Sequence, residues 1–183
     1  MGTPHQGFGR RVWLLLAMFA TLAVGGRADP VAVVDDDGRF AANFPAAVKR
    51  TNRILDTDAV QIIMCQVNAA QGTTSFMVIY CDYPEGYVAG VGASTVYKSA
   101  AKEAADNAKG TIRGEDSCKL RDVAGLEVLI DGPGRGFVER IRLYIVGDRL
   151  FQVTYVGRPD SKAGKPALDF LDSFRLLPAP VSK

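Results

Sequence analysis

Three cysteines, Cys65, Cys81 and Cys118, are the most chemically informative side chains of this sequence. In an oxidising compartment two of them could form a disulfide, and the odd number leaves at least one thiol unpaired within the chain. A hairpin that turns near Thr73 would place Cys65 opposite Cys81, whereas a shift of one residue would place them on opposite faces. Cys81–Cys118 is the rival pair. Three buried thiols that act as small hydrophobic groups are the alternative to both disulfides.

Histidine is nearly absent, and this excludes several kinds of catalytic site. The only His is His5 and the only Trp is Trp13, both in the N-terminal segment. The rest of the chain therefore cannot form a Ser-His-Asp or Cys-His arrangement, and the cysteine spacing does not resemble a zinc knuckle. We predict a non-catalytic protein without a metal or another cofactor. The alternative is a His-free hydrolase or transferase that uses a carboxylate or Lys whose pKa is strongly shifted.

One hairpin carries the candidate binding residues. Residues 137–156 contain two runs rich in β-branched and aromatic residues around Gly147-Asp148, a composition typical of a two-residue turn. With that turn, Arg140 faces Tyr155, and Arg142 lies on the same face of the hairpin. The three side chains form a cationic and aromatic strip that could contact a protein, a carboxylate or a glycan. The alternative is that the Arg stems pack under a helix or extend to solvent.

The N-terminal segment predicts export. Arg10-Arg11 precedes an apolar run at 12–24 that is short for a membrane span. We interpret residues 1–28 as a signal peptide cleaved near Ala28, with an uncleaved anchor as the alternative and with the Sec and Tat routes both open. These residues hold three of the 22 basic residues and none of the 20 acidic ones. The mature protein is therefore close to neutral, and we expect neither nucleic-acid binding nor a membrane span.

The rest of the chain predicts grouped strands and helices. The strands expected besides the hairpin cover residues 31–34, 39–44, 59–68, 74–82, 118–123 and 126–131, the last two joined by Ala124-Gly125. The helix predicted over 94–109 has an almost all-Ala apolar face, which lets it lie close to a sheet but buries little area. A second helix follows near Pro166. We predict an α+β fold: a mainly antiparallel sheet of about six to seven strands, with helices on its faces as an α/β/α sandwich.

Several segments resemble a known family. They are Phe44-Pro45 after a short strand, the run 80–84 (YCDYP), the loop 132–135 (GPGR), the hairpin segment 142–151 (RLYIVGDRLF) and the helical segment 170–174 (FLDSF). Together they resemble the PsbP-like α/β/α sandwich group of small exported bacterial proteins. This resemblance implies a binding or assembly module of the cell envelope, whose partner is an envelope or secreted protein. A carrier of a small apolar ligand, held between sheet and helices, is a further alternative.

The resemblance and the composition together predict the domain organisation. The mature protein has about 155 residues, enough for one domain with a sizeable core. The predicted parts are a signal peptide at 1–28, a lead-in at 29–37, a single PsbP-like domain at 38–177 and a flexible tail at 178–183.

Overall fold

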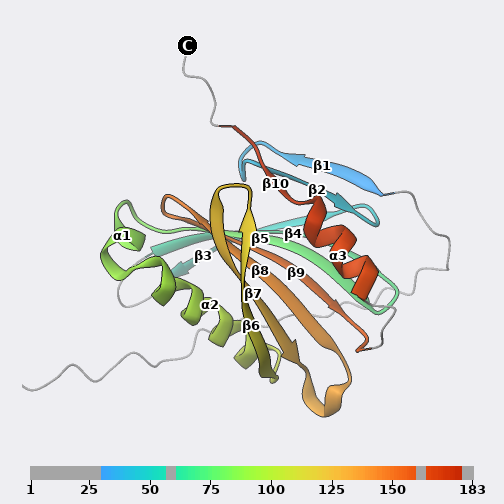
Figure 1. Ribbon diagram of the computed structural model, residues 1–183. Helices are drawn as coiled ribbons and strands as arrows, with labels where there is room; N and C mark the ends of the chain where they lie inside the picture. The colour runs from blue at the N-terminus through green and yellow to red at the C-terminus, as the bar shows by residue number, and fades with distance from the viewer. Residues whose placement is uncertain (1–29, 57–60, 160–163, 179–183) are drawn as a thin grey trace, which may run out of the picture.

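The computed structural model describes residues 30–56, 61–159 and 164–178. The predicted signal peptide with its cleavage point at Ala28, and residues 179–183 of the predicted tail, lie outside the described residues. The described chain has a large antiparallel sheet, a small sheet and helices on both faces of the large sheet (Figure 1). The predicted α+β sandwich is confirmed.

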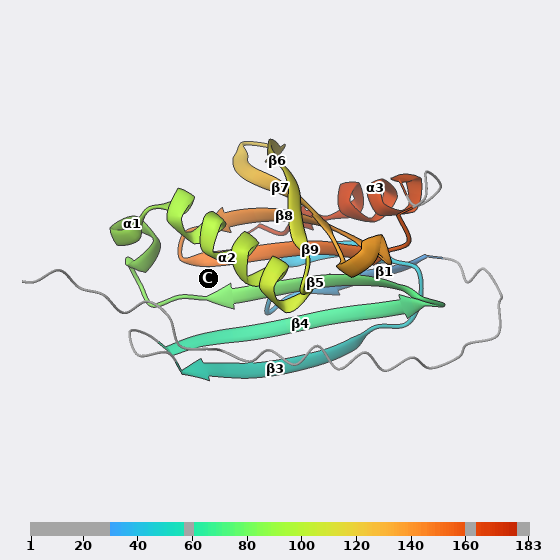
Figure 2. The same ribbon diagram turned by 90° about the horizontal axis from the view of Figure 1, so that it is seen from below.

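The large sheet has seven strands, and every neighbouring pair is antiparallel. In spatial order the strands are β3 (Lys49–Asp56), β4 (Gln61–Gln71), β5 (Thr74–Asp82), β9 (Arg149–Gly157), β8 (Val138–Val146), β7 (Val123–Asp131) and β6 (Thr111–Leu120). Figure 2 shows β3, β4, β5 and β9 following one another across the sheet. The strand β3 was not predicted from the sequence, because its run of polar residues has no strand-like alternation.

The remaining elements lie on the two faces of this sheet (Figure 1). One face is covered by α3 (Gly164–Ser173) and by a small sheet of β1 (Val31–Asp35), β2 (Phe40–Phe44) and β10 (Arg175–Leu176). The other face is covered by α1 (Tyr87–Val91) and α2 (Ala93–Asn107), and a short 3-10 helix, η1 (Pro133–Arg135), precedes β8. The predicted lead-in therefore contains a strand, β1, which pairs with β2.

The β8–β9 hairpin has the predicted turn and register. Gly147 has φ 61°, the left-handed conformation that a primed turn requires. Arg140 pairs with Tyr155 and Arg142 with Val153, as expected. The turn also positions α1, because the Asp148 carboxylate accepts hydrogen bonds from the backbone N–H groups of Gly86 and Val88, at 2.8 and 2.9 Å.

The turn between β6 and β7 differs from the prediction. It lies at Arg121-Asp122, where Arg121 has φ 53°, and not at Ala124-Gly125. Gly125 is inside β7, where an added Cβ would come within 2.4 Å of the Leu143 carbonyl oxygen and 2.6 Å of the Tyr144 ring. This glycine permits close approach of the neighbouring strand and does not form a turn.

The predicted disulfide pairs are wrong. Cys65, Cys81 and Cys118 are all free thiols in the structure. The β4–β5 turn is centred between Gly72 and Thr73, so Cys65 pairs with Tyr80 and Cys81 pairs with Met64. This one-residue difference places Cys65 and Cys81 on opposite faces of the sheet. Cys118 packs against the same cluster as Cys65, so it does not meet Cys81 either.

The two faces of the sheet have separate hydrophobic cores. The core under α3 is built from aromatic rings: Phe174 stacks on Phe40 and Tyr144, with centroid distances of 5.7 and 6.0 Å. The core under α2 contains aliphatic residues of the sheet together with Ala100, Ala101 and other small residues of the helix. The large rings fill one interface, whereas the alanine methyl groups cannot fill the other.

Candidate functional site

Helix α2 lies on the sheet through its small side chains. Its buried residues are Val96, Ala100, Ala101 and Ala105, of which Ala100 and Ala101 belong to the predicted alanine stripe, the almost all-Ala apolar face of this helix. Tyr97 fixes the N-terminal part of the helix: its hydroxyl donates to the Ala124 carbonyl oxygen at 2.9 Å and accepts the Ile145 backbone N–H at 3.1 Å. The alanines beyond this anchor are too short to reach the strands at every point.

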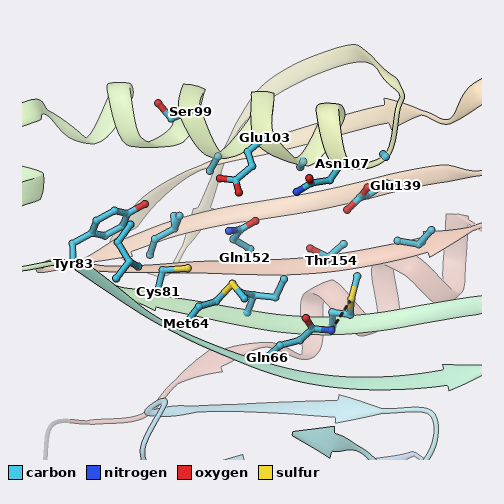
Figure 3. A pocket seen from close by; sticks show the side chains of 18 of the residues that line it. Met64, Gln66, Cys81, Tyr83, Ser99, Glu103, Asn107, Glu139, Gln152 and Thr154 are labelled. Atoms are coloured by element: carbon cyan, nitrogen blue, oxygen red, sulfur yellow. Dashed lines mark hydrogen bonds between the residues drawn. The ribbon is translucent and has the colours of Figure 1, made fainter. Parts of the chain in front are cut away.

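The space that these alanines leave is a groove of about 160 Å³ between α2 and strands β4, β5, β9 and β8. The residues that line it come from both layers, as Figure 3 shows. They are Ile62, Met64, Gln66, Met77, Ile79, Cys81, Tyr83, Ser99, Ala100, Glu103, Ala104, Asn107, Ala108, Phe137, Glu139, Leu150, Gln152, Thr154 and Val156. We refer to this site as the α2 groove.

The strand register arranges the floor of the groove in rows. One end is apolar, because Cys81 pairs with both Met64 and Leu150. The opposite end carries Glu139, which pairs with Val156. Val156 follows Leu150 by six residue steps along β9, which corresponds to roughly 20 Å along the strand. The groove therefore has an apolar end and an acidic end.

Polar side chains between these ends have few partners within the protein. Thr154 is only 2% exposed, yet its hydroxyl makes no hydrogen bond to another described residue. The same holds for the side chains of Gln152, Asn107 and Glu139. Gln66 donates a weak bond of 3.6 Å to the Met77 sulfur (Figure 3). Buried polar groups normally have partners, so this arrangement leaves several donors and acceptors open to a ligand or to water.

Burial controls the ionisation of the groove. It raises the pKa of Glu139 to about 7, so this carboxyl is present in both protonation states near neutral pH. The pKa of Glu103 is also raised, first by burial of its carboxylate at the groove rim and then by the nearby Asp106. Burial, with smaller contributions from Glu103 and Asp82, raises the pKa of Cys81 to about 12, so this residue is a neutral thiol and not a nucleophilic thiolate.

The predicted strip of Arg140, Arg142 and Tyr155 lies on the other face of the sheet. Nε of Arg140 donates to Glu127 Oε1 at 2.9 Å, and Nε of Arg142 donates to Glu127 Oε2 at 2.7 Å. Arg142 also bonds to Asp172 of α3 at 2.6 Å. Tyr155 is 3% exposed in the aromatic core. The structure thus brings the two Arg side chains together on one carboxylate and places Tyr155 beneath α3.

The α2 groove was not predicted from the sequence as a specific site. The almost all-Ala face of the helix at 94–109 was interpreted only as a surface that lies close to a sheet. The useful signal was the presence of Glu139, Gln152 and Thr154 at positions of β8 and β9 that face α2, since polar residues at inward positions need a partner or a ligand.

Within residues 30–56, 61–159 and 164–178, no three His, Cys, Asp or Glu side chains gather as a metal site would require. Among the same residues, no helix is long and apolar enough to cross a membrane.

The architecture is an α/β/α sandwich with the PsbP-like fold. The chain is similar to the solution structure of cyanobacterial PsbP (CyanoP) from Synechocystis sp. PCC 6803, with a TM-score of 0.60 at 10% sequence identity. The match covers 86% of this chain and 98% of that chain. No family model matches the sequence, and no curated protein matches it. The predicted PsbP-like fold is confirmed, and at this identity the likeness extends to the fold alone.

Proposed function

We propose that this protein is an exported, non-catalytic binding module of the cell envelope that holds a small ligand in the α2 groove. The observation that carries the proposal is the groove itself, an unfilled space of about 160 Å³ in a fold whose other core is filled by aromatic rings. The basic and apolar N-terminal segment supports export.

The size of the groove limits its ligand. Ligand pockets for drug-sized molecules are usually about 300–1,000 Å³, whereas a cavity of about 150 Å³ accommodates one benzene ring. A ring or a short alkyl chain would lie on Ile79 and Met77, and a polar group would meet the open side chains of Gln152 and Thr154, which pair with these two residues. This is the small apolar-ligand carrier among the alternatives that the sequence leaves open, with a polar group added.

A methionine methyl NMR titration tests the proposal. The four methionines are Met1 and Met18, within the predicted signal peptide, and Met64 and Met77, which both line the groove. In the exported protein, ¹³C-methyl methionine therefore reports on the groove alone. We expect benzyl alcohol to shift both methyl resonances in a saturable manner.

Two variants on the same helix control the titration. Ala104→Leu would fill the groove and abolish the shifts, whereas Ala93→Leu, at an exposed position outside the groove, would leave them unchanged. Shifts that persist in Ala104→Leu, or the absence of saturation in the unmodified protein, would contradict binding in the groove.

A His-free hydrolase is the second candidate, and Glu139 favours it. A carboxyl in a groove with its pKa raised to about 7 by burial is suited to proton transfer near neutral pH. However, no described Ser, Thr, Tyr or Cys side chain donates a hydrogen bond to it. Turnover of ester or amide substrates that disappears in Glu139→Gln, while benzyl alcohol still binds, would favour this candidate over the binding module.

An envelope or secreted protein is the proposed macromolecular partner, and the strip of Arg140, Arg142 and Tyr155 stays a prediction for its contact surface. Arg140 is the more accessible of the two Arg residues, with 29% of its side chain exposed against 16% for Arg142. A pull-down with the strip intact and with these three residues replaced tests this surface. Equal recovery of a partner in both cases would exclude the strip as its site.

A further inference from the structure

The ionisable side chains that line the α2 groove all titrate as acids. Of the lining residues, Glu103 and Glu139 carry carboxylates, and Cys81 and Tyr83 contribute a thiol and a phenol; no Lys or Arg is among them. Lys102, which precedes Glu103 on the helix, pairs with Asp106 at 2.5 Å on the exposed side of α2. The groove therefore presents negative charge without an internal counter-ion.

The two layers bring this charge to one end of an apolar surface. Helix α2 runs from Tyr97, which contacts Ile145 at the apolar end, toward Gly110, which lies against Ile130 and Asp131. Ile130 pairs with Glu139. The last turn of the helix, with Asn107 and Ala108, thus covers the end of the groove at which Glu139 lies, and Figure 3 shows the Glu103 carboxylate turned toward the sheet.

A buried hydroxyl, that of Thr154, lies near the Glu139 carboxylate and adds a hydrogen-bonding group to this end of the groove. The Thr154 hydroxyl belongs to a residue that is 2% exposed, and it has no partner among the described residues. It lies one row from Glu139, because Thr154 pairs with Ile141 and Val156 pairs with Glu139. A ligand head that donates hydrogen bonds can satisfy the carboxylate and the hydroxyl together, whereas an anionic head cannot.

We propose, resting on the function proposed above, that the α2 groove binds a small amphipathic cation: one ring or a short alkyl chain with a protonated amine. The apolar body lies on Met77 and Val156, which occupy the rows of Thr154 and Glu139. The ammonium group lies at the acidic end against Glu139, with Thr154 within the same site. Hydrogen bonds to a charged group exceed neutral ones by about 1 to 1.5 kcal/mol, which corresponds to roughly tenfold in affinity.

Three probes that share one ring test the charge preference. Benzylamine, benzyl alcohol and benzoate are titrated at pH 8 into the exported protein labelled with ¹³C-methyl methionine. We expect benzylamine to bind roughly tenfold more tightly than benzyl alcohol, and benzoate to bind more weakly than either. Glu139→Gln should reduce the affinity for benzylamine to that for benzyl alcohol. Glu115→Gln removes the same charge from an exposed position outside the groove and should change neither.

The pH dependence separates a direct contact from a structural role of Glu139. The titratable groups that face it across the groove are Glu103 from α2 and Cys81 and Tyr83 from β5; β4 and β9 contribute only neutral lining residues. The thiol and the phenol stay protonated at pH 8, because burial raises the pKa of each. The benzylamine advantage should therefore fall as the pH is lowered from 8 to 5.5, while benzyl alcohol binding stays constant.

The outcomes distinguish the two proposals. If none of the probes shifts Met64 or Met77, the binding function fails and this inference fails with it. If benzyl alcohol binds but benzylamine binds no more tightly, or benzoate binds best, the binding function stands and the cation preference is overturned. If Glu139→Gln does not fold, the same comparison with Glu103→Gln, on the rim of the groove, decides the matter.

Discussion

The two faces of the large sheet are packed with opposite kinds of side chain. Under α3, the Phe174 ring contacts three other rings at centroid distances of 5.7 to 6.0 Å. These are the rings of Phe40, Tyr144 and Phe151. Under α2, the helix contributes alanines, and a groove of about 160 Å³ remains. A filled interface stabilises the fold, whereas an unfilled one with open polar groups is available for binding.

The same contrast appears in the charged residues. On the α3 face, Glu127 is paired with Arg140 and Arg142, so the charges satisfy one another. On the α2 face, Glu139 has no such partner among the residues that the structure describes, and burial raises its pKa to about 7. Arg140 and Arg142, which the sequence pattern singles out, are thus engaged in ion pairs. Glu139, which the pattern does not single out, makes no hydrogen bond to another described residue.

The largest expected loss of stability tests whether the aromatic core under α3 contributes more to the free energy of unfolding than the core under α2 does. Phe174→Ala removes a ring that is 2% exposed and contacts three other rings, and it should lower the free energy of unfolding by about 3–5 kcal/mol. Met64→Ala, at the groove, should cost about 2 kcal/mol, because its side chain already borders open space. Urea unfolding measures both, and equal losses would contradict the difference between the faces.

Replacing one alanine on each face by leucine should give the next largest difference in the free energy of unfolding. Ala167 of α3 is 2% exposed, so Ala167→Leu overpacks the core and should cost about 1–3 kcal/mol. Ala104 of α2 borders the groove, so Ala104→Leu should change the free energy of unfolding by less than about 0.5 kcal/mol, because Leu is also a good helix former. Thermal unfolding of both variants checks this. A comparable loss in Ala104→Leu would mean that the groove is not free space.

Much of the fold could be predicted from the sequence because its signals are local. The Gly147-Asp148 turn fixes the β8–β9 register by its composition, and α3 has apolar residues at helical spacing ahead of Pro178. The strand β3 could not be predicted in this way, since its residues lie at a sheet edge and carry no apolar alternation.

The candidate site was harder to predict, because it depends on the strand register and on the space that the small side chains of α2 leave above the sheet. A turn centre that differs by half a residue changes which face Cys81 occupies, and this converts an expected disulfide cysteine into a groove residue. The alanine stripe predicts a close helix, but only the packed structure shows where its methyl groups stop short of the strands.

Removing Arg142 sharpens the distinction between a binding strip and a packing contact. Arg142→Met keeps the stem but removes the bonds to Glu127 and Asp172, and it should lower the free energy of unfolding by about 1–2 kcal/mol. Arg140→Met should cost less, because Arg140 makes one of these ion pairs and is more exposed. Chemical denaturation provides the measurement. If neither variant loses stability, the strip has no structural role and a binding role gains support.

The smallest expected change in the free energy of unfolding comes from replacing one Glu on each face by Gln. This change depends on pH and has opposite signs on the two faces. The pKa of Glu139 rises from 4.5 to about 7 in the folded protein. The folded state therefore binds more protons than the unfolded state between these values, and its stability falls as the pH rises through them. Glu139→Gln removes this loss. It should raise the free energy of unfolding by about 1 kcal/mol at pH 8, after allowing for solvent at the groove, and by nearly nothing at pH 4.5.

Glu127→Gln is the matched variant on the α3 face. It breaks two ion pairs and should lower stability at pH 8, so the two isosteric substitutions shift the unfolding midpoint in opposite directions. The midpoints are measured in urea at pH 4.5, 6 and 8. Loss of stability in both variants at pH 8 would mean that Glu139 has a favourable partner in solution, and the acidic end of the groove would then be a packed contact like the one beneath α3.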